Sequence, residues 1–107
     1  MTKCEFFRDH ERITGFSVSG HSGYAEAGQD IVCAAISAAV AMAETTINDV
    51  CGGKAKVRVK EADARITLTL PAACEEEDAI QAVLTGLMLY LISLRDDYED
   101  YIEVLEV

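Results

Sequence analysis

One cysteine and one histidine have the types and spacing of a nucleophile and its base. Cys33 follows Asp30, a good helix N-cap, by three positions, and a helix N-terminus favours the thiolate, which is the nucleophilic form. His21 lies twelve positions earlier (33 minus 21) and reaches Cys33 only if the chain between them folds back. The residues leave two interpretations open: Cys/His catalysis, or a small core cysteine in an apolar helix.

Further groups near Cys33 could support such a nucleophile. The backbone N–H groups of Cys33 and Ala34 lie at the helix start and are predicted to bind a developing oxyanion. An ionised Asp30 opposes the thiolate at close range, so an imidazolium at His21 has to outweigh it. Ser37 is one helical turn beyond Cys33, where its hydroxyl either supports the site or bonds back to the Cys33 carbonyl, the usual behaviour of a serine inside a helix.

The segment between the histidine and the helix is predicted to be a mobile loop. Its glycines are separated by two and then four residues, which is not a dinucleotide or phosphate fingerprint. A loop that closes over an extended peptide suits this pattern better. The substrate loop is expected to include Gly20, Ser22, Gly23, Gly28 and Gln29, and the candidates to orient His21 are Gln29, Asp30 and Glu26.

The composition predicts one globular domain over residues 1–107, with 50% hydrophobic and 26% charged residues. Its net charge of -10 repels nucleic acid and anionic lipid and attracts basic partners. No basic segment followed by an apolar core opens the chain, and the apolar runs are interrupted before they reach about 18 to 20 residues. We therefore expect a cytoplasmic protein without a membrane segment.

The cysteines are not arranged as metal ligands. There are four of them, none in a Cys-x-x-Cys pair, and two histidines. In a reducing cytosol such cysteines are expected to be free thiols, and this spacing does not build a structural zinc site. No metal or other cofactor is expected.

The elements that position these residues alternate between strands and helices. Strands are predicted at residues 3–8, 13–19, 54–60, 65–70 and 101–107, and helices at 30–50 and from the acidic run 75–78 to about 95–97. Gly15 is the expected site of a bulge, because Ile13 is out of step with Phe16. The first helix is expected to be buried on most of its circumference.

The order is then β-β-α-β-β-α-β, an α+β two-layer sandwich. Half-exposed, alternating strands imply a mixed, mostly antiparallel sheet with two helices on one face. One face of the second hairpin carries five of the nine basic residues, namely Lys54, Lys56, Arg58, Lys60 and Arg65. This is either an ordinary solvated face or the contact surface of a non-catalytic ribosome-assembly or rRNA-binding module.

The residues Gly-His-Ser-Gly-Tyr-Ala-Glu-Ala-Gly-Gln-Asp-Ile-Val-Cys-Ala-Ala-Ile-Ser, at 20–37, resemble the signature of the ribosomal-processing cysteine protease family, Prp. The resemblance implies a cytoplasmic bacterial endopeptidase that removes the N-terminal extension of large-subunit ribosomal protein twenty-seven after an aromatic pair. It implies His21 as general base, Cys33 as nucleophile, and Asp30 and Ser37 as supporting residues. Ser22 departs from the alanine that is more usual in this motif.

The same resemblance implies a homodimer and a loop that moves when the substrate peptide enters. Leu89 and Ile92, beyond the main apolar stripe of the second helix, are in keeping with a partner surface. An acidic enzyme is also steered towards a basic ribosomal protein. We expect a basic ribosomal protein as substrate and no direct nucleic-acid binding.

Overall fold

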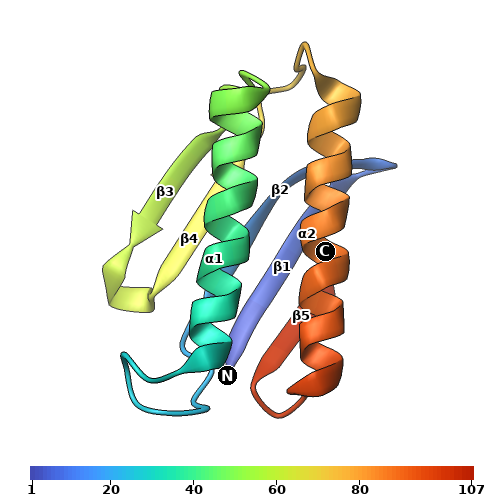
Figure 1. The fold of residues 1–107 in the computed structure, drawn as a ribbon. Coiled ribbons are helices and arrows are strands. Elements are labelled where there is room, and N and C mark those ends of the chain that lie inside the picture. Colours follow the sequence, from blue (N-terminus) through green and yellow to red (C-terminus); the bar gives the residue numbers. More distant parts are fainter.

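The computed structural model describes all of residues 1–107 as two layers, a sheet and a pair of helices (Figure 1). In chain order the strands and main helices are β1 (Thr2–Asp9), β2 (Arg12–Ser19), α1 (Ile31–Thr45), β3 (Lys56–Lys60), β4 (Arg65–Thr69), α2 (Glu77–Asp97) and β5 (Ile102–Glu106). The sheet order is β3-β4-β2-β1-β5, with β1 and β5 parallel and the other pairs antiparallel. Both helices cover one face, so the predicted fold class and element order are confirmed.

The bulge in the first hairpin lies one residue from its predicted position. Gly15 pairs with Phe7, and the register then skips Thr14, which is the extra residue on β2. The prediction of a bulge at Gly15 was therefore wrong. Gly15 is needed for a different reason, because a Cβ at this position would stand 2.2 Å from the carbonyl oxygen of Leu68 on β4. The two strands approach this closely only without a side chain between them.

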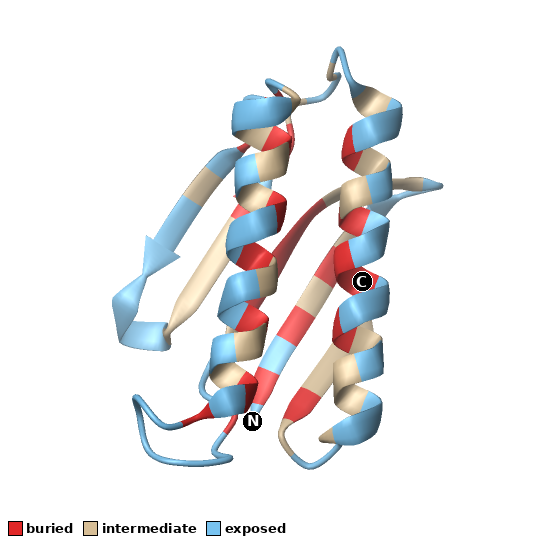
Figure 2. Cartoon of the chain, viewed as in Figure 1, coloured by how far each residue is buried: buried red, intermediate tan, exposed pale blue.

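Helix α1 covers the sheet with one stripe rather than with most of its circumference. Its buried residues are Val32, Ile36, Val40 and Ala43, and they lie on the side towards the sheet (Figure 2). On the other side Met42 is 68% exposed. The prediction of burial around most of the helix was wrong, since a helix in a two-layer fold has solvent on its outer side.

The ends of α1 are formed by the residues that the sequence predicts. The side chain of Asp30 caps the helix by accepting a hydrogen bond from the backbone N–H of Cys33. At the other end one π-helical turn, Thr46–Val50, continues the helix. Gly52 then adopts a φ of 62°, the left-handed conformation that commonly terminates helices.

The helices are more apolar than the sequence analysis allows for. By length and composition alone, Ile31–Val50 and Glu77–Asp97 could each cross a membrane, so the prediction that no segment reaches this limit was wrong. In the fold both helices pack an apolar stripe on the sheet, and Ile80, Leu84 and Leu91 of α2 are fully buried. Since 28% of each of these apolar stretches is buried in the fold, packing in the core accounts for part of this composition.

The β3 edge of the sheet extends beyond α1 and is not covered by either helix (Figure 1). Val59 of β3 pairs with Ile66 of β4, and its side chain is 69% exposed. An open strip of sheet therefore runs beside α1. The opposite edge of the sheet is formed by β5, which pairs with the interior strand β1. The C-terminal strand is therefore docked in the sheet, as predicted.

Candidate active site

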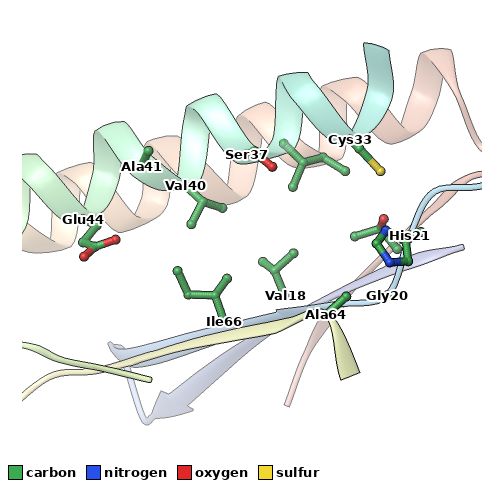
Figure 3. A pocket seen from close by; sticks show the side chains of 12 residues that line it. Val18, Gly20, His21, Cys33, Ser37, Val40, Ala41, Glu44, Ala64 and Ile66 are labelled. Carbon is green, nitrogen blue, oxygen red and sulfur yellow. The ribbon is translucent and has the colours of Figure 1, made fainter. Parts of the chain in front are cut away.

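Cys33 and His21 lie on two walls of one cleft. Cys33 is in the first turn of α1, and His21 directly follows Gly20 at the end of β2. Both line a cleft of about 280 Å³ between α1 and the sheet. Figure 3 shows the sulfur pointing from the helix start towards the loop that carries His21. The fold thus brings together the two residues that the sequence analysis singled out.

The sulfur of Cys33 has a backbone hydrogen-bond donor. The N–H of Ser22 points at Sγ over 3.3 Å, whereas the His21 ring makes no hydrogen bond to the sulfur. This contact places a backbone donor beside the candidate nucleophilic atom and joins the loop to the first turn of α1.

Asp30 ties the loop to the helix start. One carboxylate oxygen accepts from the N–H of Cys33 at 2.9 Å. The other accepts from the hydroxyl of Ser22 at 2.5 Å and from the N–H of Ala25 at 3.4 Å. The hydrogen bond from the Ser22 hydroxyl is the largest cause that lowers the pKa of Asp30, and the N–H groups of Cys33 and Ala25 lower it further. Desolvation raises the pKa by less than the Ser22 hydrogen bond lowers it, so the pKa falls to about 2. Asp30 is therefore ionised at neutral pH.

The same cap contradicts the prediction for the oxyanion donors. The N–H of Cys33 is engaged by the Asp30 carboxylate, and the N–H of Ala34 donates to the Asp30 carbonyl at 3.0 Å. Neither group is free to bind an oxyanion in this arrangement. Ser22, which sequence reasoning placed among the loop residues, is only 2% exposed and supplies the backbone donor at the sulfur. The only feature of the sequence that pointed to this role of Ser22 was its position next to His21.

The remaining predicted residues lie around this centre. Ser37 is exposed and lines the cleft with Cys33 and His21. Its hydroxyl makes no hydrogen bond to the Cys33 carbonyl, so of the two alternatives for Ser37 the bond back along the helix is not formed. Gln29 closes a turn of the loop by donating its N–H to the Glu26 carbonyl at 3.0 Å. None of Gln29, Glu26 and Asp30 hydrogen-bonds to His21.

Two features hold the loop in place besides Asp30. At its start Gly20 has a φ of 82°, and a Cβ there would come within 2.9 Å of the Met1 carbonyl oxygen. In its middle the ring of Tyr24 packs edge to face on Tyr98 and Tyr101, with centroid separations of 5.5 and 5.3 Å. Both partners lie at the junction of α2 and β5. The sequence gives no hint of this contact, which joins residues far apart in the chain.

A second cleft meets the first at the candidate nucleophile. It has a volume of about 690 Å³, lies beneath the glycine-bearing loop, and shares His21, Cys33 and Ser37 with the first cleft. Gly23 and Gly28 line this second cleft as well. An extended chain could therefore pass Cys33 with one side in each cleft.

The basic residues of the second hairpin face away from these clefts. Arg65 donates to the hydroxyl of Ser17 at 2.7 Å and lies 4.0 Å from Glu5. Lys60 is 3.3 Å from Asp63. The four cysteines are free thiols, and no three His, Cys, Asp or Glu side chains are grouped so that they could hold a metal ion.

Comparisons with known proteins point to one family. The family model described as "Cysteine protease Prp" matches residues 1–103. The ribosomal processing cysteine protease Prp of Bacillus subtilis (strain 168) is 27% identical over an alignment of 107 positions. The alignment covers 97% of this chain and 96% of that protein.

Solved structures agree at the level of the fold. Two of them are of an essential ribosomal processing protease Prp from S. aureus, one in complex with a covalently linked product peptide and one with a substrate peptide. Their TM-scores are 0.89 and 0.85 over the whole of both chains, at 19% and 18% identity.

Proposed function

Because the chain belongs to the Prp family of cysteine proteases, and so is a hydrolase, we propose that it cuts an N-terminal extension from a ribosomal protein with Cys33 as nucleophile and His21 as base. The observation that carries the proposal is the shared cleft: Cys33 and His21, twelve positions apart, line the same two clefts at their junction. Asp30 supports them by holding the loop against the helix start, and Ser37 forms the cleft wall beside them.

In this mechanism His21 accepts the thiol proton, and the Cys33 sulfur attacks the carbonyl carbon of the scissile peptide bond. The tetrahedral intermediate collapses as the C–N bond breaks, and His21 returns the proton to the leaving amine. Water, deprotonated by His21, then attacks the thioester carbonyl and releases the acid product and the thiol. Since the N–H groups of Cys33 and Ala34 are engaged by Asp30, we assign the oxyanion to the N–H of Ser22, which already points at the sulfur.

The proposed substrate is the N-terminal extension of large-subunit ribosomal protein twenty-seven, cleaved after an aromatic pair. The sequence resemblance supports this assignment, and the S. aureus relative has been solved with a substrate peptide. The net charge of -10 favours a basic ribosomal protein over RNA as the partner. The apolar walls of the first cleft suit large apolar side chains.

We further propose that the enzyme works in the cytoplasm as a homodimer. The outer faces of the two helices expose Met42 by 68%, Leu89 by 57% and Tyr90 by 43%. Met42 and Tyr90 also line a groove of about 390 Å³ between α1 and α2. Exposed apolar side chains beside a surface groove are typical of a protein interface. Sedimentation as a monomer at micromolar concentration would count against the dimer.

The alternative, a non-catalytic rRNA-binding module, has weaker support. Two of its five basic residues, Lys60 and Arg65, already have acidic partners within 4.0 Å. If it holds, ribosomal particles bind the Cys33→Ala variant as well as the wild type, and reversing Lys56 and Arg58 abolishes binding.

The test of the protease proposal is incubation of the extended ribosomal protein with the purified enzyme, followed by mass spectrometry. We expect one cleavage site, no cleavage by Cys33→Ala or His21→Ala, and full cleavage by the matched control Cys51→Ala. Cleavage by the Cys33→Ala protein at the wild-type rate would eliminate the proposed nucleophile. Failure of the wild type to cut the extended protein would eliminate the proposed substrate.

A further inference from the structure

The first cleft ends at a carboxylate that the mechanism does not use. Glu44 lies on α1 eleven positions after Cys33 (44 minus 33), which is about 16 Å along the helix. Its side chain points from the helix into the cleft, at the end that is distant from Cys33 (Figure 3). It is half-buried, and it takes part in none of the ion pairs of the molecule.

The cleft between Cys33 and Glu44 is apolar. Its walls include Val18 and Ile66 from the sheet and Val40 from α1, and none of the residues that line it is a lysine or arginine. A peptide lying in this cleft would exclude water from the Glu44 carboxylate. A carboxylate that loses water without gaining a partner is strongly disfavoured. A bound peptide that brings a cation to this point gives the carboxylate a charge-assisted partner in place of the lost water.

We propose that Glu44 is a specificity residue that binds a cationic group of the substrate peptide; this inference rests on the proposed protease function. An extended strand advances about 3.3 Å per residue, so 16 Å corresponds to about five residues from the scissile bond. The cation is either a lysine or arginine side chain at that distance or the free α-amino group of a short N-terminal extension. Both supply an N–H donor with positive charge.

The experiment measures kcat/KM for peptides that differ only in this charge. One arm compares lysine with norleucine at the fourth, fifth and sixth residues from the scissile bond. A second arm compares peptides that end near the fifth residue with a free or an acetylated α-amine. Wild-type enzyme is expected to prefer the cationic peptide of one arm by about 10- to 160-fold, the range for one hydrogen bond to a charged group. The arm that shows the preference identifies the source of the cation.

The matched variants are Glu44→Gln, Glu44→Lys and the control Glu75→Gln, which removes one charge from an exposed site that does not line the cleft. Glu44→Gln should reduce the preference to less than about twofold, mainly through KM, because the contact is made equally in ground and transition states. Glu44→Lys should prefer glutamate at the same substrate position. The control should keep the wild-type preference.

If Glu44→Gln preferred the cationic over the neutral peptide by the same ratio of kcat/KM as the wild type, the inference would be overturned. If the wild type cuts no peptide, the proposed protease function fails instead. In that case fluorescence anisotropy of the labelled lysine and norleucine peptides on Cys33→Ala still tests Glu44. Equal binding of the two peptides, or a preference that survives the added Glu44→Gln change, would then overturn it.

Discussion

Removing the ring of Tyr24 should loosen the loop that carries His21. Besides the hydrogen bond from the Ser22 hydroxyl to Asp30, this ring anchors the loop on the rest of the fold through edge-to-face contacts with Tyr98 and Tyr101. Tyr24→Ala deletes both contacts. Tyr24→Phe is the matched control, because the contacts use the ring and the phenolic oxygen makes no hydrogen bond.

The size of the effect follows from the ring geometry. The centroid separations, 5.5 and 5.3 Å, are those of favourable edge-to-face pairs, each of which contributes about 0.5–1.5 kcal/mol beyond buried area. Tyr24 is 42% exposed, which places the sum of the two pairs in the lower part of the range, about 1–2 kcal/mol. Since about 1.4 kcal/mol is a factor of ten, undocking of the loop should become about 5- to 30-fold more frequent.

Amide hydrogen exchange measured by NMR reports this undocking directly. The N–H of Tyr24 donates to the Ser22 hydroxyl oxygen at 3.2 Å, and the N–H of Ala25 donates to Asp30 at 3.4 Å. Both amides should exchange about 5- to 30-fold faster in Tyr24→Ala and at the wild-type rate in Tyr24→Phe. Amides of β2 and β4 should be unaffected. Equal exchange at residues 24 and 25 in Tyr24→Ala and wild type would refute the anchoring role.

Three further predictions concern stability and thiol chemistry. Asp30, with its pKa lowered from 3.8 to about 2, stabilises the fold above about pH 4 and loses this effect as the pH falls towards 2. Ser22→Ala removes the largest cause of the lowered pKa, so acid unfolding followed by circular dichroism should begin at higher pH; an unchanged midpoint would contradict this. Gly15→Ala should destabilise the protein by about 1–3 kcal/mol through overpacking, whereas Gly86→Ala, in open space on α2, should stabilise it by about 0.5–1 kcal/mol; urea unfolding distinguishes them, and equal effects would be inconsistent with the close approach at Gly15. Burial raises the pKa of the Cys4 thiol to about 12, so peptide mapping should find Cys4 alkylated only in denaturant, and native-state alkylation at pH 8 would disprove its burial.

The fold could be predicted because its signals are local. Apolar alternation marks the strands, and Asp30 and Gly52 mark the ends of the first helix. The errors concern contacts between distant segments. Nothing near Gly15 in the sequence shows that the carbonyl of Leu68 will lie against it. The outer side of α1 was assigned to the core because alanine and methionine are equally compatible with a buried and an exposed helix face.

Part of the site could be predicted because it also depends on local signals. The pairing of His21 with Cys33 needs only a loop that folds back, and the glycines of the loop indicate one. The oxyanion prediction, by contrast, conflicted with another prediction from the same residues. A capping Asp30 accepts the N–H of the third helical residue, and that residue is Cys33. The cap and a free Cys33 donor could not both be present.

The sequence predicts an electrostatic conflict in the site, because an ionised Asp30 beside a thiolate at Cys33 opposes it. The structure reduces that conflict: hydrogen bonds from the Ser22 hydroxyl and the N–H groups of Cys33 and Ala25 compensate the carboxylate charge. Ser22 also directs its own N–H at the Cys33 sulfur. One residue of the loop therefore compensates the carboxylate charge and contacts the candidate nucleophilic sulfur at the same time. It follows that the position of the loop controls the surroundings of the Cys33 sulfur, because undocking the loop removes both contacts together.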